Sequence, residues 1–359
     1  VADELEESAE RARSRGGAAA AAAFLERSME LTVDPALRAT RAMAAAAANL
    51  DAANSEAAGR LLVVAEGGSL PTPDAATAAR LRAHIAFAHG RGHESAALLL
   101  DAARKLEPFD LQLAHETYLE ALGARMFAGR LGTSVTQREV ARYARGALRD
   151  APSDRPIDLL LDGIVTFVLD GRVPGVPVLQ RAVAAFQDEE LSRQQHVERW
   201  LSFACPIVQE LAVHQLWDFD AWQQLAERSV QLARDTGALS FLPTALMYLA
   251  GARLHAGDTR SAEAMISEGD AITTATGFVP VHYASLALAG WKGDETHALQ
   301  LIAADTHEAI GRGEGIVVTI AAYAQAVLYN GLGRYQEAME SAQESIQDDS
   351  FGFVDWTLI

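Results

Sequence analysis

The chain has 359 residues, 50% of them hydrophobic, and carries a formal charge of −18 at neutral pH. Such a charge repels a phosphate backbone, so we expect no direct contact with nucleic acid. The single cysteine, Cys205, excludes an internal disulfide and a cysteine-based metal site, and it suits a reducing cytoplasm. The sequence has no signal-peptide layout and no apolar run of membrane-spanning length, so we expect a cytoplasmic location and no membrane contact.

From the N-terminus onward, the sequence predicts a succession of helical hairpins. Alanine has the best helix propensity and recurs throughout, whereas alternating β-branched runs are scarce. The first hairpin is expected to pair residues 4–14 with 18–31. Later hairpins are marked by a turn residue with a small residue five positions on, in order Ala53/Ala58, Arg91/Ala96, Gly129 with an enlarged turn, Gly171/Val176, Ala221/Ala226, Gly257/Ala262, Gly293/Ala298 and Gly333/Ala338.

The last of these hairpins, residues 322–346, is the most regular. Gly333 is expected to end its first helix in the left-handed conformation, and Ala326 and Ala338 to lie where the two helices cross. Larger apolar side chains are expected on the facing surfaces, namely Tyr329, Tyr335, Met339 and Ile346. The spacing resembles the tetratricopeptide pattern. The sequence therefore predicts an all-α, tetratricopeptide-like right-handed superhelical solenoid of about nine helical hairpins, forming a single domain over residues 1–359.

The two ends of the chain predict a piece of a larger protein. The sequence begins with Val1 and closes on an apolar half-helix rather than on a polar capping helix. Exposed apolar surface of this kind drives association. We therefore expect a possible homodimer through Phe353, Trp356 and Ile359 at the C-terminal end.

Motifs for catalysis and metal binding are not found. The sequence lacks a phosphate-binding P-loop, an H-E-x-x-H pair and a G-x-S-x-G turn, so we expect no enzymatic activity, no cofactor and no metal site. His84, His89 and His93 are spread across a predicted turn, which argues against a shared ligand set. Cys205 lies in an apolar context that predicts a buried, inert thiol.

One pattern predicts a ligand or partner groove. First helices of stacked hairpins line the concave side of a solenoid, and aromatic groups there hold ligands or peptides. Counting back two or ten residues from the turn markers gives the candidate groove residues His255, Tyr283, Trp291, Tyr323, Met247 and His89. Ordinary packing between repeats is the alternative for this set. Three other indoles are expected to anchor the core, namely Trp200, Trp217 and Trp222.

The order of several short stretches resembles the helical arm of LuxR-family large ATP-binding transcriptional regulators. The resemblance runs from about residue 1 to the end, through residues 86–92, 98–108, 116–122, 216–218, 233–239 and 248–251. This family is similar in plan to the maltose regulator, with an ATPase, a tetratricopeptide-like arm and a helix-turn-helix domain. Only the arm has a counterpart here.

The resemblance implies a regulatory sensor arm for this chain. Such an arm would bind a small-molecule inducer or a regulatory protein and pass the signal to ATPase and DNA-binding domains outside this chain. A second interpretation belongs to a different class. In it the chain is a scaffold that binds peptides or helices in its concave groove and has no link to transcription.

Overall fold

The computed structural model describes residues 1–13, 17–68, 70–90, 94–150, 153–190, 194–277 and 281–346. Within these ranges the regular secondary structure is helical throughout, and no strand is present. The helices pack mainly against their neighbours in the chain. This confirms the predicted all-helical class. The C-terminal residues Phe353, Trp356 and Ile359, on which the expected homodimer depends, lie outside the described ranges.

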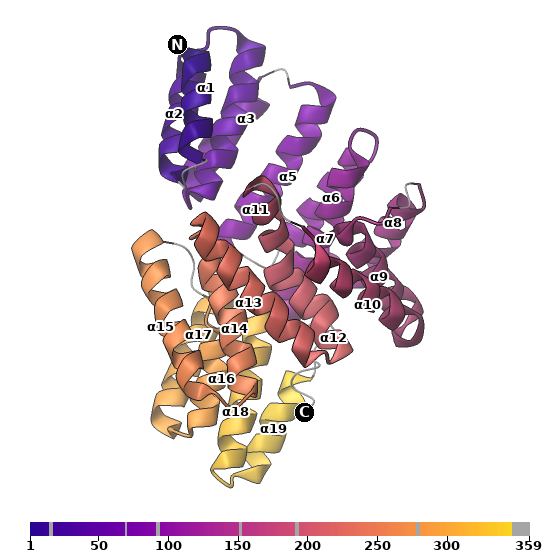
Figure 1. The fold of residues 1–359 in the computed structure, drawn as a ribbon, viewed down its shortest axis with the longest axis vertical. Helices are drawn as coiled ribbons and strands as arrows, with labels where there is room; N and C mark the ends of the chain where they lie inside the picture. The colour runs from indigo at the N-terminus through magenta and orange to yellow at the C-terminus, as the bar shows by residue number, and fades with distance from the viewer. Residues whose placement is uncertain are drawn as a thin grey trace.

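The N-terminal helices begin at one end of the long axis of the molecule and lead to its middle (Figure 1). They are α1 (Ala2–Arg13), α2 (Ala18–Glu30), α3 (Pro35–Asp51), α4 (Ser55–Glu66), α5 (Thr72–His89), α6 (Ser95–Leu106) and α7 (Leu111–Ala128). Side chains of Asp34, Asn54 and Asp110 cap the starts of α3, α4 and α7 by accepting a backbone N–H. Buried alanines dominate the packing of α2, α3 and α4, because a methyl group lets helix backbones approach closely.

The middle of the chain contains an unusual helix. Its elements are η1 (Gly129–Leu131), α8 (Gln137–Asp150), α9 (Pro156–Asp170), α10 (Arg172–Asp188), α11 (Gln194–Phe203), η2 (Ala204–Val213) and α12 (His214–Leu216). The backbone of η2 is a π-helix, and it contains Pro206. Proline has no N–H and clashes with the carbonyl four residues back, which gives a local reason for the wider turn. Such stretches are rare and occur often at functional sites.

The C-terminal helices lead from the middle of the molecule to its other end (Figure 1). They are α13 (Phe219–Thr236), α14 (Leu242–His255), α15 (Thr259–Thr276), α16 (Tyr283–Lys292), α17 (Glu295–Gly311), α18 (Gly315–Gly331) and α19 (Tyr335–Ser345). Aspartates again cap helix starts, with Asp218, Asp258 and Asp294 before α13, α15 and α17. None of the described helices combines the length and hydropathy needed to cross a membrane.

The predicted turn glycines adopt the left-handed backbone that the hairpins require. Gly257, Gly293 and Gly333 have φ of 81°, 75° and 75°. Ala53, marked in the sequence as a poorer turn residue, has φ of 60°. These four turn positions are therefore confirmed.

The marker Ala221/Ala226 is wrong. Ala221 lies inside α13, because Asp218 caps that helix by accepting the Ala221 N–H at 2.9 Å. The left-handed turn residue is Trp217, with φ of 57°. The residue five positions later is then Trp222, which stands where the neighbouring hairpins carry a small side chain. Trp217 itself is 53% exposed, which corrects its expected role as a core anchor, whereas Trp200 and Trp222 are buried.

We expect opposite stability changes at two of these turns. Ala53→Gly should stabilise the protein by about 0.5–1 kcal/mol, because glycine removes left-handed strain that exceeds its cost in unfolded-chain entropy. Gly257→Ala should destabilise by about 1 kcal/mol, although nothing lies within 4 Å of an added Cβ there. Urea denaturation midpoints of both variants check this. Shifts of the same sign would contradict it.

The prediction for the last hairpin is wrong in part. Tyr335, Met339 and Ile346 do not face α18, since they are 71%, 57% and 45% exposed. The buried positions of α19 are Ser341 and Ser345. Because α18 covers one face of α19, side chains on the opposite helical face stay exposed. Ala338 is half-buried.

Contacts also join helices that are far apart in sequence. The start of α18 packs against the end of α7 and η1. Gly315 sits so close to the carbonyl oxygen of Ala128 that a Cβ would have no room. Nearby, the Arg130 guanidinium donates to the backbone oxygen of Glu344 at 2.7 Å. The chain therefore closes part of itself around a shared core, which runs from Ala83 to Ala324.

Candidate functional site

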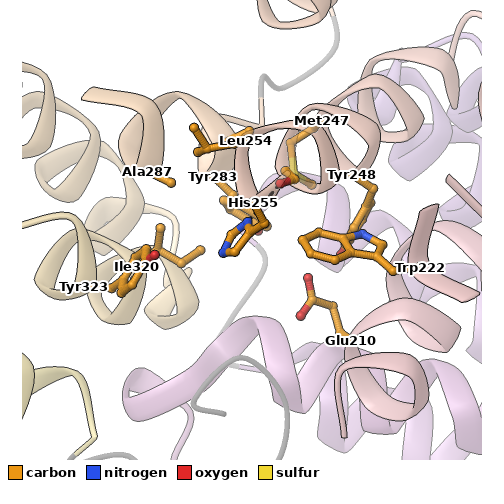
Figure 2. A pocket seen from close by; sticks show the side chains of 12 residues that line it. Glu210, Trp222, Met247, Tyr248, Leu254, His255, Tyr283, Ala287, Ile320 and Tyr323 are labelled. Carbon is orange, nitrogen blue, oxygen red and sulfur yellow. Dashed lines mark hydrogen bonds between the residues drawn. The ribbon is translucent and has the colours of Figure 1, made fainter. Parts of the chain in front are cut away.

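A pocket lies where the π-helix meets four later helices. It is lined from η2 by Glu210, from α13 by Trp222, and from α14, α16 and α18 by Met247, Tyr248, Gly251, Leu254, His255, Tyr283, Ala284, Ala287, Ile320 and Tyr323. The cavity volume is about 30 Å³, enough for one or two water-sized groups. Its wall is apolar and aromatic except at a few polar atoms. Figure 2 shows the Glu210 carboxylate pointing toward the aromatic side chains.

The carboxylate of Glu210 is buried. One oxygen, Oε2, accepts from Nδ1–H of His214 at 3.1 Å. The other oxygen, Oε1, and the hydroxyl oxygen of Tyr248 make no hydrogen bond of regular geometry among the described residues, although the phenol lies close enough to Glu210 for that carboxylate to raise its pKa. A buried acceptor without a donor is costly, so this end of the pocket is prepared for a polar group from outside.

Aromatic rings form a continuous row beside this carboxylate. The ring centroids of His214 and Trp222 are 4.8 Å apart, those of Trp222 and His255 are 5.4 Å apart, and those of His255 and Trp291 are 5.8 Å apart. The indole N–H of Trp291 donates to the Tyr323 hydroxyl at 3.4 Å. These contacts fix the ring orientations before any ligand arrives.

Burial sets the protonation of the rings in the pocket. It lowers the pKa of His255, whose Nδ1–H donates to the Gly251 carbonyl at 2.9 Å, so the imidazole is neutral at pH 7. Burial, together with the nearby charge of Glu210, raises the pKa of the Tyr248 phenol. Burial also raises the pKa of Tyr323. The two phenols are therefore neutral near pH 7, and Glu210 is the acidic side chain of the wall.

Four of the six predicted groove residues line this one pocket, namely Met247, His255, Tyr283 and Tyr323. Trp291 lies next to it, in contact with His255 and Tyr323, and is 41% exposed. His89 is elsewhere: its Nδ1 donates to the Ile85 carbonyl at 2.8 Å within α5. His89 was predicted from the turn marker Arg91, which belongs to an earlier hairpin than the markers of the other five residues. His89 therefore does not line this pocket.

Several residues of the pocket were missed by the sequence reasoning, among them Glu210, Trp222 and Tyr248. Glu210 could not be found by counting residues back from a turn, since it lies on the irregular helix η2 rather than on the regular first helix of a hairpin. Trp222 could have been found, because the true turn at Trp217 places it at the small-residue position of its hairpin. Trp222 therefore fills space at a position where the neighbouring hairpins carry a small side chain.

A second group of charged side chains is paired internally. The Nε of Arg80 donates to Glu120 at 3.0 Å, and Nε2 of His84 lies 2.9 Å from the same carboxylate. Burial would raise the pKa of Glu120, but these two partners outweigh it and lower the pKa to about 2. His115 and Asp158 form a similar pair at 2.9 Å. Because these groups neutralise one another, we assign them to packing between α5, α7 and α9.

Other candidates for chemistry do not form a site. Among the described residues, no cluster of histidine, cysteine, aspartate and glutamate is arranged to hold a metal ion. Cys205 is buried, as the sequence predicted, and burial raises the pKa of its thiol to about 12. A thiol with this pKa is a poor nucleophile near neutral pH.

Fold and site together define an all-helical protein whose packed helix pairs surround an aromatic pocket with a buried carboxylate. A scan against models of protein families and a search of curated proteins find no match to this chain.

Proposed function

We propose that this chain is the regulatory sensor arm of a LuxR-family transcriptional regulator, in which the pocket at Glu210 binds a small-molecule inducer. In this proposal the helix pairs form a tetratricopeptide-like right-handed superhelical solenoid. The observation that carries the proposal is the convergence of η2, α13, α14, α16 and α18 on one aromatic cavity. The lining of this cavity, apolar with few polar groups, is the kind found in small-molecule sites.

The pocket also offers a route for a signal. Its wall joins residues from Glu210 to Tyr323, which belong to several successive helix pairs. A ligand that contacts residues from more than one pair binds best to one relative arrangement of these pairs. A ligand switches the arm only if it binds one arrangement more tightly than the other. A ligand with equal affinity for both arrangements leaves their populations unchanged. The ATPase and DNA-binding domains that would receive this signal lie outside the chain.

The volume of this cavity fits a small head group. About 30 Å³ admits a small head group but not an aromatic or a long aliphatic side chain of a peptide. A peptide-binding scaffold would instead need an extended groove with several anchor positions.

A thermal-shift screen of the chain against metabolites tests ligand binding. A ligand present at 100 times its Kd is expected to add about 2.7 kcal/mol to the free energy of unfolding. The same ligand should change the fluorescence of Trp222 and Trp291, since both indoles contact His255 of the pocket. A screen in which no compound shifts the melting temperature would argue against a sensor arm.

The link to transcription has a separate test. Sequencing the reading frame on both sides of this chain is expected to show an upstream P-loop ATPase and a downstream helix-turn-helix. A frame without both would leave ligand binding possible for the pocket but would reject the LuxR-family assignment.

A further inference from the structure

The charge of the pocket wall identifies the kind of ligand it fits. Glu210 is fully buried, and its Oε1 makes no hydrogen bond of regular geometry among the described residues. None of the residues that line the cavity is a lysine or an arginine. A carboxylate in such surroundings loses its hydration without gaining a full counter-charge. A ligand that brings a positive charge offsets this cost, whereas an anion increases it.

The aromatic rings favour the same charge. The faces of aromatic rings carry negative potential, and they attract a cation within about 6 Å. Trp222, Tyr248, Tyr283 and Tyr323 all line the cavity. The hydroxyl of Tyr283 is already directed away to Glu314 at 2.5 Å, so this residue offers its ring to the cavity rather than its oxygen. Tyr248 offers an oxygen that can accept.

The volume of the cavity then limits which cations fit. A volume of about 30 Å³ holds one or two water-sized groups, which corresponds to an ammonium and the carbon attached to it. Three methyl groups on the nitrogen do not fit without moving the wall. A primary ammonium also has three N–H donors, which a quaternary nitrogen lacks, and two acceptors await them at Glu210 and Tyr248.

We infer that the pocket binds the protonated primary amine of a small organic cation, with Glu210 as its counter-ion and Tyr248 as a second acceptor. This inference rests on the proposed function, since it names the chemical class of the inducer. The cavity is partly open, so the rest of such a ligand would extend out of it.

Three probes with one carbon chain test the head group, namely n-butylammonium, n-butyltrimethylammonium and 1-butanol. Their binding to the chain is measured by titration of indole fluorescence at constant ionic strength. We expect n-butylammonium to bind at least tenfold more tightly than either of the others, because it alone combines charge, donors and fit. Equal binding of n-butylammonium and 1-butanol to the parent protein would overturn the inference without any variant.

Two matched variants locate the effect. Glu210→Gln keeps the shape and an acceptor for His214 but removes the charge, so n-butylammonium affinity should fall at least tenfold while 1-butanol affinity stays within about twofold. Glu116→Gln changes another buried glutamate, which neither lines the cavity nor contacts a residue that does, and should leave both affinities unchanged. Equal losses in the two variants would overturn the role of Glu210.

The outcomes separate this inference from the function on which it rests. If neutral or anionic compounds raise the melting temperature in a Trp222-dependent way and amines do not, the pocket is a sensor site and the amine inference fails. If amines bind with the stated preference, both hold. If no compound of any charge binds, the proposed function fails and the inference fails with it.

Discussion

Replacing Gly315 with alanine is expected to destabilise the protein by about 3 kcal/mol, the upper end of the range for overpacking a core contact. The first residue of α18 lies against the end of α7, and an added Cβ would collide with the carbonyl oxygen of Ala128 and lie 2.9 Å from the Leu131 nitrogen. These are backbone atoms, which cannot rotate away as a side chain does. Urea denaturation of the variant measures the loss.

The same helix provides the control for this prediction. Gly331 is the last residue of α18, and a Cβ there would meet nothing within 4 Å. Gly331→Ala should therefore stabilise the protein by up to about 1 kcal/mol, because alanine has the higher helix propensity. If Gly315→Ala behaves like Gly331→Ala, the contact between α7 and α18 does not exist in solution, and the helix array is open there.

This contact between α7 and α18 shows where sequence reasoning reaches its limit. A repeat pattern predicts the packing of each hairpin on its neighbours, because each unit buries a similar face. It carries no information on helices that meet after many intervening units. Gly315 looks in the sequence like an ordinary residue at a helix start. Only the structure, which places Ala128 beside Gly315, shows that a Cβ at this position would have no room.

Turns were predictable because their chemistry is local. A glycine in the left-handed region costs little, so Gly257, Gly293 and Gly333 could be identified from spacing alone. Trp217 was missed because a bulky residue in that conformation is uncommon, and the search required a small residue five positions later. The turn was therefore placed at Ala221, four residues too late, and the position of Trp222 in its hairpin was not recognised.

The candidate site was predictable where it lies on regular helices. Met247, His255, Tyr283 and Tyr323 share one face of successive helices, and equal counting from correct turns brought them together. Glu210 belongs to a π-helix, whose wider turn breaks that counting. Glu210, the acidic residue of the pocket, therefore could not be predicted from a regular helical periodicity.

The two indoles that flank His255 are expected to respond very differently to truncation. Trp222 is 5% exposed and Trp291 is 41% exposed, although their ring centroids lie 5.4 and 5.8 Å from that of His255. Trp222→Ala leaves a large cavity in the core and should cost about 3–5 kcal/mol. Trp291→Ala removes a partly hydrated ring and should cost about 1 kcal/mol or less.

Ligand binding should show a different pattern from stability. Trp291 holds the rings of His255 and Tyr323, and such aromatic contacts contribute about 0.5–1.5 kcal/mol. We therefore expect Trp291→Ala to weaken n-butylammonium binding by about threefold to tenfold while the protein remains folded. Chemical denaturation and fluorescence titration of the remaining indoles measure both quantities on one sample. A Trp291→Ala variant that loses several kcal/mol of stability but binds normally would make this indole a packing residue and would remove it from the site.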